Sequence, residues 1–231
     1  MIQAGFDVIW SQELNTVFAN AHDFGMDQHF SADSLPGKAP TITSRQDIRE
    51  IGPAAVRKQG LGTLMRGDHF GIIGGPPCPD FSIGGKNRGG EGDRGRLTQV
   101  FVERICGLQP MFFLIENVKG LISTRKHREF IYNGIWKLDE SGYAVDLTVL
   151  NALDFGVPQD RERVFIVGVK RSLVRSLYSR NLEKGQDSAW PFAQMVRDTW
   201  QKLSLESKRR QLIPLARCGD SAEENSSSHR K

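Results

Sequence analysis

Five short apolar runs, separated by longer segments with helical spacing, constrain the fold of this chain most. The runs cover residues 6–10, 70–74, 111–115, 143–150 and 164–169. They are nearly continuous rather than alternating, which is typical of strands that are buried on both faces. The segments between them, such as 97–108 and 128–138, carry apolar residues three and four apart. The alternation predicts an α/β fold, with a mostly parallel sheet and helices on both faces.

A cysteine follows one of these expected strands directly. Cys78 lies in the segment GGPPCPDFS, residues 74–82, whose three prolines restrict the backbone. In parallel sheets, ligands bind at the carboxyl ends of the strands. A lone cysteine is more often an inert packed residue than a nucleophile. The rigid polar loop at a sheet edge favours a thiol that is held in place for chemistry.

Charged residues follow or precede two other expected strands. Glu116 comes directly after the run 111–115, so its carboxyl group would face the same edge as Cys78 and could donate or accept a proton. Arg161 and Arg163 precede the run 164–169 and share one face if that segment is extended. Two fixed guanidinium groups can bind a carbonyl oxygen and a phosphate. The alternative is that Glu116 is simply a solvated carboxylate and that Arg161 and Arg163 are surface charges at the start of a strand.

Composition limits the class of protein. A chain of 231 residues suits one α/β domain, and its net charge of +4 permits a polyanionic partner without arguing for one. The three cysteines are far apart, with no CxxC pair or histidine cluster, so we expect neither disulfides nor a metal site. No apolar run approaches the roughly 18 residues of a membrane-spanning helix. These features predict a soluble cytoplasmic protein with no membrane contact.

The motifs, taken in chain order, resemble those of one enzyme family. Pro77-Cys78, Glu116-Asn117-Val118 and Gln159-x-Arg161-x-Arg163 resemble motifs IV, VI and VIII of the cytosine-C5 DNA methyltransferases. Residues 93–97 are similar to motif V, and residues 149–158 to motif VII and the approach to motif VIII. The resemblance implies a Rossmann-like class I methyltransferase sheet.

Three parts of the chain are therefore expected. Residues 1–170 would form a partial catalytic methyltransferase domain, residues 171–217 a helical C-terminal extension and residues 218–231 a disordered tail rich in Ser and Glu. The glycine-rich polar stretch 84–95 is expected to be a mobile loop.

By the same resemblance, the chemistry is covalent catalysis on cytosine. Cys78 would attack C6 of the ring, and Glu116 would be the group at N3. Arg163 would hold the O2 atom of the base, and Arg161 would support the site or bind a nearby phosphate. The target base must leave the double-stranded DNA to reach such a site, and the loop 84–95 is the expected lid.

The resemblance implies S-adenosylmethionine as the methyl donor. Glu13 matches the acid of motif II that binds the ribose hydroxyls. Asp47 and Ile48 match motif III, where the acid meets the adenine amino group and the apolar side chain packs on the ring. Leu97 and Pro77 occupy the motif V and motif IV positions beside the cofactor. An isolated acid after a strand is otherwise unremarkable.

Several family motifs are not found in the sequence. The glycine-rich turn of motif I, the target recognition domain and motifs IX and X have no clear counterpart. Loss of the first strand would leave an unpaired strand edge and an incomplete core. A late-assigned start codon, a split enzyme completed by a complementary polypeptide, and a truncated inactive product all fit. Target sequence cannot be inferred, and a restriction-modification system and an orphan enzyme remain equally open.

Three other functions remain open at this point. One branch of the family methylates tRNA, so RNA is an alternative substrate. The chain could also be a nucleic-acid-binding or regulatory partner that retains an inactive site. A thiol redox protein is the least favoured alternative, because no second cysteine lies near Cys78 in the sequence.

Overall fold

The computed structural model of the chain describes residues 6–32, 42–62, 64, 69–77, 95–178 and 196–202. Cys78, residues 84–94 of the expected lid and the expected tail lie outside these residues, whereas Gly95 begins a helix. Among the described helices, none combines the length and apolar character needed to cross a membrane.

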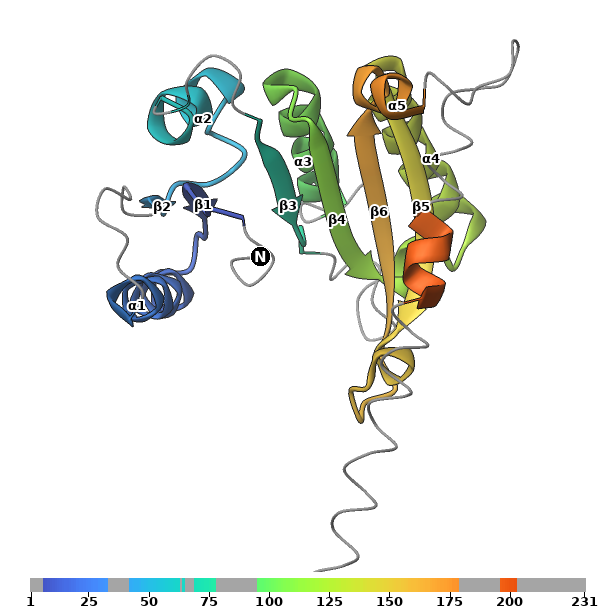
Figure 1. Cartoon of the computed structure of the whole chain (residues 1–231), viewed down its shortest axis with the longest axis horizontal. Coiled ribbons are helices and arrows are strands. Elements are labelled where there is room, and N and C mark those ends of the chain that lie inside the picture. Colours follow the sequence, from blue (N-terminus) through green and yellow to red (C-terminus); the bar gives the residue numbers. More distant parts are fainter. Residues whose placement is uncertain are drawn as a thin grey trace, which may run out of the picture.

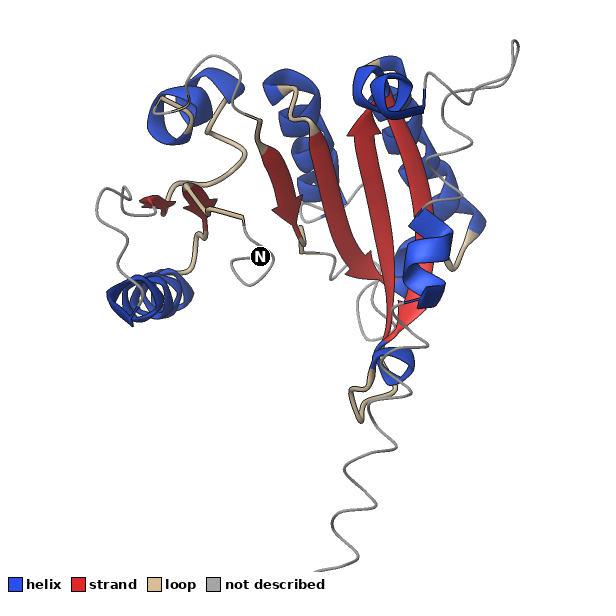
Figure 2. Ribbon diagram, in the orientation of Figure 1, coloured by secondary structure: helices blue, strands red, loops and turns tan. Residues whose placement is uncertain are grey.

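A four-stranded mixed sheet forms the centre of the structure (Figure 1). Its order is β3 (Gly71–Gly74), β4 (Phe112–Val118), β6 (Glu162–Lys170) and β5 (Tyr143–Asn151). β3 pairs with β4 in parallel, whereas β6 is antiparallel to both β4 and β5. Figure 2 shows β6 running opposite to its neighbours β4 and β5.

The expected mostly parallel pairing is therefore wrong for β6. A parallel neighbour needs a crossover connection of about a dozen residues or more, usually through a helix. Residues 152–161 between β5 and β6 hold only the short 3₁₀ helix η5 (Ala152–Phe155), so the chain turns back beside β5. The predicted alternation of strand, helix and parallel strand is confirmed for β3, α3 (Gly95–Leu108) and β4.

Strand limits differ from the apolar runs where pairing extends into polar sequence. β4 continues to Val118 because its whole length pairs with β6, from Phe112 with Val169 to Val118 with Arg163. β6 begins at Glu162, which pairs with Asn151 of β5. Glu116 and Arg163 therefore lie inside strands rather than after or before them. The run 6–10 is the poorest match, since β1 covers Trp10–Gln12.

The main core fills the space between one face of the sheet and helices α3 and α4 (Arg125–Glu140). Its buried residues are Val102, Ile105, Phe113, Ile115, Leu121, Ile131, Leu138, Tyr143, Val164 and Ile166. The ring of Phe113 packs edge-on to Tyr143, whose hydroxyl donates a 2.8 Å hydrogen bond to the Pro110 carbonyl. Alternate strand residues thus provide this face, as period-two geometry requires.

The opposite face of β5 and β6 is covered by later helical segments. α5 (Arg171–Tyr178) places Val174 against Ala144, and residues 196–202 place Val196 and Trp200 in the same cluster. Trp200 also packs on Phe155 of η5 and Phe165 of β6. Helices therefore lie on both faces of the sheet, in agreement with the predicted α/β class.

A second, smaller sheet lies beside the first (Figure 1). In it β1 pairs in parallel with β2 (Ile42–Ser44), and α1 (Thr16–Ala32) connects the two strands. Helix α2 (Pro53–Gly60) joins the two sheets. Its buried Val56 belongs to a hydrophobic cluster with Leu108 of α3, and Trp10 of β1 and Ile72 of β3 pack against this cluster. Among the described residues, β1 pairs only with β2, and β3 only with β4.

Two glycines give a test of this packing. A Cβ atom on Gly168 would lie 2.1 Å from the Phe113 ring, whereas one on Gly134 in α4 would meet Val102 at an ordinary 3.6 Å. Gly168→Ala should lower the free energy of unfolding by about 1–3 kcal/mol through overpacking. Gly134→Ala should raise it by about 0.5–1 kcal/mol, because alanine is the better helix former. Urea unfolding of both variants measures the contrast, and equal effects would contradict the packing.

Candidate active site

The segment that leads toward Cys78 lies against the end of β4. Pairing of β3 with β4 ends with Gly74 opposite Ile115, so the chain continues past the last residues of β4. The Asn117 side-chain amide donates a 3.2 Å hydrogen bond to the Pro76 carbonyl. Gly75 lies beside Glu116, since a Cβ atom there would be 3.1 Å from the Glu116 Oε2 atom. This register places Pro77 at the carboxyl edge of the sheet, and Cys78 is the next residue in the sequence.

Glu116 and Arg163 form an ion pair at this edge. The Arg163 Nε atom lies 3.0 Å from the Glu116 Oε1 atom. Glu116 is opposite Phe165 in the ladder and Arg163 is two residues earlier, so the side chains are diagonal neighbours on one face. Their side chains are 36% and 23% exposed, respectively, which leaves both open to a ligand. Together they present an acceptor or proton donor and a fixed cation side by side.

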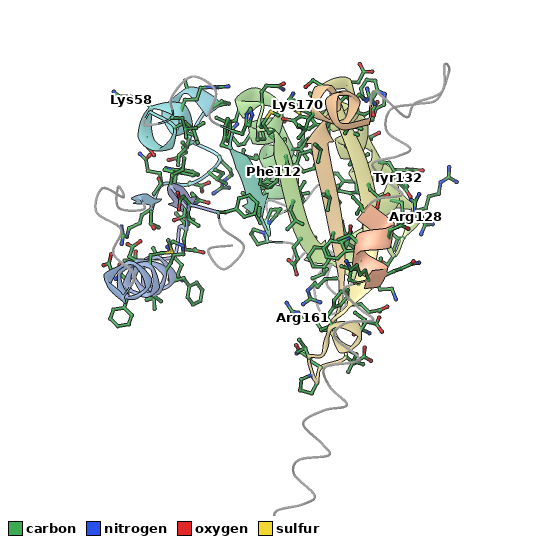
Figure 3. The ribbon with its side chains drawn as sticks, viewed as in Figure 1. Lys58, Phe112, Arg128, Tyr132, Arg161 and Lys170 are labelled. Carbon is green, nitrogen blue, oxygen red and sulfur yellow. The ribbon has the colours of Figure 1, made fainter. Side chains whose placement is uncertain are left out.

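Arg161 has a different environment. Its side chain is exposed, and its backbone N–H donates to the Asn151 Oδ1 atom at 3.3 Å. The Asn151 amide also donates to Asp160 at 2.8 Å, which ties the strand entry to the end of β5. Figure 3 shows Arg161 at the same edge of the sheet. The structure therefore brings Arg163 to Glu116 and leaves Arg161 facing solvent.

The two acids expected to bind cofactor follow the strands of the smaller sheet. Glu13 follows β1 and donates its backbone N–H to the Ser44 carbonyl of β2 at 3.0 Å. Its carboxylate accepts a 2.8 Å hydrogen bond from the Asn15 backbone. Asp47 follows β2 and binds the Arg49 guanidinium through both oxygens. This contact with Arg49 lowers the pKa of the Asp47 carboxyl.

The apolar residues expected near the cofactor lie in two places. Ile48 is half-buried beside Asp47, and its carbonyl accepts a 3.0 Å hydrogen bond from Arg104 of α3. Leu97 is half-buried in the first turn of α3, and Pro77 is exposed past the end of β3. The expected cofactor residues are thus divided between the two sheets.

Sequence reasoning gave no role to Asn117 or Gly75. A signal for Asn117 was present, because it occupies the third inward position of β4 after Phe113 and Ile115. A polar residue at an apolar position of a strand indicates a specific hydrogen bond. The close approach of Gly75 to a carboxylate has no comparable mark in the sequence.

Among the residues that the structure describes, no group of three or more His, Cys, Asp or Glu side chains is arranged to hold a metal ion.

Comparison with known proteins identifies the family. The family described as C-5 cytosine-specific DNA methylase matches residues 2–227. The Type II methyltransferase M.NmeDI of Neisseria meningitidis serogroup C is 55% identical over 169 residues, which cover 71% of this chain and 39% of that protein. M.FnuDI of Fusobacterium nucleatum, also a Type II methyltransferase, is 38% identical over 171 residues, which cover 74% and 43%.

A solved structure shares the fold. A protein crystallised as a candidate DNA modification methyltransferase of an E. coli prophage matches with a TM-score of 0.58 and 28% identity, over 74% of this chain and 42% of that one. The chain thus spans about two fifths of the length of these relatives. The family match covers most of the chain, including the edge where Glu116 and Arg163 meet. The chain belongs to the C-5 cytosine-specific DNA methylase family.

Proposed function

We propose that this chain carries the catalytic residues of an enzyme that transfers a methyl group from S-adenosylmethionine to C5 of cytosine in DNA. Family membership supports the reaction class. The observation that carries the assignment of residues is the Glu116–Arg163 pair, which lies beside the loop that leads to Cys78. A nucleophile, a carboxyl group and a guanidinium would then meet at one sheet edge.

The proposed reaction begins with the Cys78 thiolate, because C5 of cytosine is too weak a nucleophile to be methylated unaided. The thiolate adds to C6 while the Glu116 carboxyl group gives a proton to N3, and the ring becomes an enamine. C5 then attacks the methyl carbon of the donor, and S-adenosylhomocysteine leaves. A base then removes the C5 proton, and the electrons of that C–H bond form the C5–C6 double bond and expel the Cys78 thiolate. N3 returns its proton to the Glu116 carboxylate, and the aromatic ring is restored.

Arg163 and Arg161 would act on different parts of the substrate. Arg163 is fixed by Glu116, so its remaining N–H groups can hold the O2 atom of a base whose N3 faces that carboxyl group. Arg161 is exposed at the same edge, which suits a phosphate of the DNA backbone. The base must be flipped out of the duplex to reach this pair.

Residues of both sheets would bind the methyl donor. Glu13 is partly exposed at the carboxyl edge of β1, and carboxylates fit ribose hydroxyls. Asp47 would exchange part of its contact with Arg49 for the adenine amino group, while Ile48, Leu97 and Pro77 would provide apolar contacts. S-adenosylmethionine supplies an electrophilic methyl group when bound.

We further propose that this site is completed by a complementary polypeptide or by a further segment of a longer chain. β1 and β3 are both edge strands of parallel pairs in the described structure, and α2 holds their sheets side by side. Unpaired edges accept an added strand through backbone hydrogen bonds.

Large apolar side chains are exposed on α1, which connects β1 with β2, and on β3. Phe18 and Phe24 of α1 are 64% and 66% exposed, and Ile73 of β3 is 40% exposed. Such side chains offer apolar contacts to an added segment. The alternative, a chain inactive by itself that binds nucleic acid or regulates a partner, rests on the same unpaired edges.

Covalent trapping tests the nucleophile. With S-adenosylmethionine and the segments that complete the site, duplex DNA that contains 5-fluorocytosine should give this chain a covalent complex that is stable on a denaturing gel, because fluorine at C5 blocks the final elimination. Cys78→Ala should abolish the complex, and Cys106→Ala should retain it. A complex that depends on Cys106, or on neither cysteine, would refute the assignment of Cys78. The same base in RNA tests the RNA alternative.

Glu116→Gln tests the proton donor. The amide keeps the shape of the side chain but cannot protonate N3, so the rate of complex formation should fall about a hundredfold or more. Glu129→Gln is the matched control, since Glu129 is an exposed carboxylate that pairs with Arg125 on α4. Equal rates in the two variants would remove Glu116 from the mechanism.

Complementation tests the completed site. Segments of the Neisseria relative outside the matched region should form a complex with this chain and bring S-adenosylmethionine binding into the range of calorimetry. Phe18→Asp should prevent the complex by placing a charge in the contact. Trp136→Asp is the control, because Trp136 is 61% exposed on α4. Tight cofactor binding by the chain alone would contradict the need for a partner.

A further inference from the structure

One face of helix α3 reaches both parts of the proposed cofactor site. Leu97, Arg104 and Leu108 follow one another at intervals of two turns and one turn, so they share a stripe of the helix. Leu97 is a proposed contact of the cofactor, and Leu108 packs with Ile51 in the chain between β2 and α2. Arg104 lies between these two positions and contacts the same chain.

Arg104 holds two backbone carbonyls of the turn that follows β2. Its Nη2 atom donates to the Ile48 carbonyl at 3.0 Å and to the Arg49 carbonyl at 3.4 Å. Both carbonyls come directly after Asp47, whose own carbonyl accepts the Glu50 N–H at 2.9 Å. The Asp47 carboxylate accepts the Arg49 backbone N–H at 2.9 Å. The turn is therefore closed by its own hydrogen bonds and also held from α3.

Packing alone does not account for a guanidinium at this position. The Arg104 Nε atom is buried and has no hydrogen-bond partner among the described residues. An unpaired buried donor costs stability, whereas a methionine side chain would fill similar space without that cost. The advantage of arginine here therefore lies in the two contacts with the turn.

The side chains on this turn fit the adenine ring and its amino group. Arg49 lowers the pKa of the Asp47 carboxyl, so the side chain is a hydrogen-bond acceptor at neutral pH. The Asp47 side chain is 15% exposed, and Ile48 beside it is half-buried. An acceptor and an apolar side chain on a fixed backbone can select a flat ring that carries an amino donor.

We infer that Arg104 is a positioning residue for the adenine part of the methyl donor. By holding the Ile48 and Arg49 carbonyls, it sets where Asp47 and Ile48 lie relative to Leu97 on its own helix. The inference rests on the proposed roles of Asp47 and Ile48. It adds that a residue of a different element controls the affinity for the cofactor through the backbone of the turn.

Hydrogen exchange tests the hold on the turn without any cofactor. The amides of Glu50 and Ile51 donate to the Asp47 carbonyl, and in Arg104→Met they should exchange about tenfold or more faster. The amide of Ile115, which is buried in β4, should keep its rate and so reports any loss of global stability.

Arg57→Met is the matched control. Arg57 of α2 donates through its Nη2 atom to the Gly107 and Leu108 carbonyls of α3, at 3.2 and 2.8 Å, so this variant loses the same kind of contact away from the turn. It should change the rates at Glu50 and Ile51 by less than about twofold.

Cofactor affinity tests the role of the turn. In the complex with the segments that complete the site, Arg104→Met should weaken the binding of S-adenosylhomocysteine about tenfold by calorimetry. In the Asp47→Ala background the same change should cost about threefold or less, because the acceptor that Arg104 positions is absent. Arg104→Lys should recover part of the affinity, since one ammonium nitrogen can donate to both carbonyls.

Equal exchange rates at the turn in Arg104→Met and Arg57→Met would overturn the inference. So would equal losses of affinity with and without the Asp47 carboxylate, since Arg104 would then act on stability alone. If exchange rises but the wild-type complex does not bind S-adenosylhomocysteine, the proposed function is wrong and with it the cofactor role of Arg104, although its hold on the turn stands.

Discussion

The antiparallel insertion of β6 between β4 and β5 is the constraint on which the site depends. It sets Val118 opposite Arg163, and the diagonal between strands then brings the guanidinium to Glu116. A slip of one residue would turn Arg163 to the opposite face and put Val164 in its place. The buried pairs Ile115–Ile166 and Asn117–Val164 resist such a slip, because they would lose the core against α3 and α4. Apolar packing on one face therefore fixes polar geometry on the other.

The sequence predicted the α/β class and four strands of the main sheet near their observed positions, and both follow from apolar runs and helical spacing. The meeting of Glu116 with Arg163 was implied only by the family resemblance, because in a parallel sheet a residue before its strand would lie at the opposite edge from one after its strand. The direction of β6 was not predictable from such signals, since apolar content carries no strand order. The exposure of Arg161 and the contact of Asn117 with Pro76 also arise only from pairing between segments distant in the sequence.

β4 shows how one strand can serve structure and chemistry in adjacent residues. Successive side chains point to opposite faces, so Glu116 reaches the solvent-accessible pair with Arg163 while Asn117 stays in the core. Glu116 and Asn117 are thus adjacent in the chain but occupy environments of different polarity.

The aromatic contact of Trp200 joins three segments that are far apart along the chain. It packs on Phe165 in β6 and on Phe155 in η5, and its neighbour Arg197 lies 3.5 Å from Asp146 of β5. Phe165 is the ladder partner of Glu116, so the segment 196–202 packs on the residue opposite the proposed proton donor. Release of this segment would expose β5, β6 and η5 on one face, while the ladder bonds of β6 to β4 and β5 stay intact. Amide protons of this segment should consequently exchange at a lower opening free energy than that of Phe165 in the central strand.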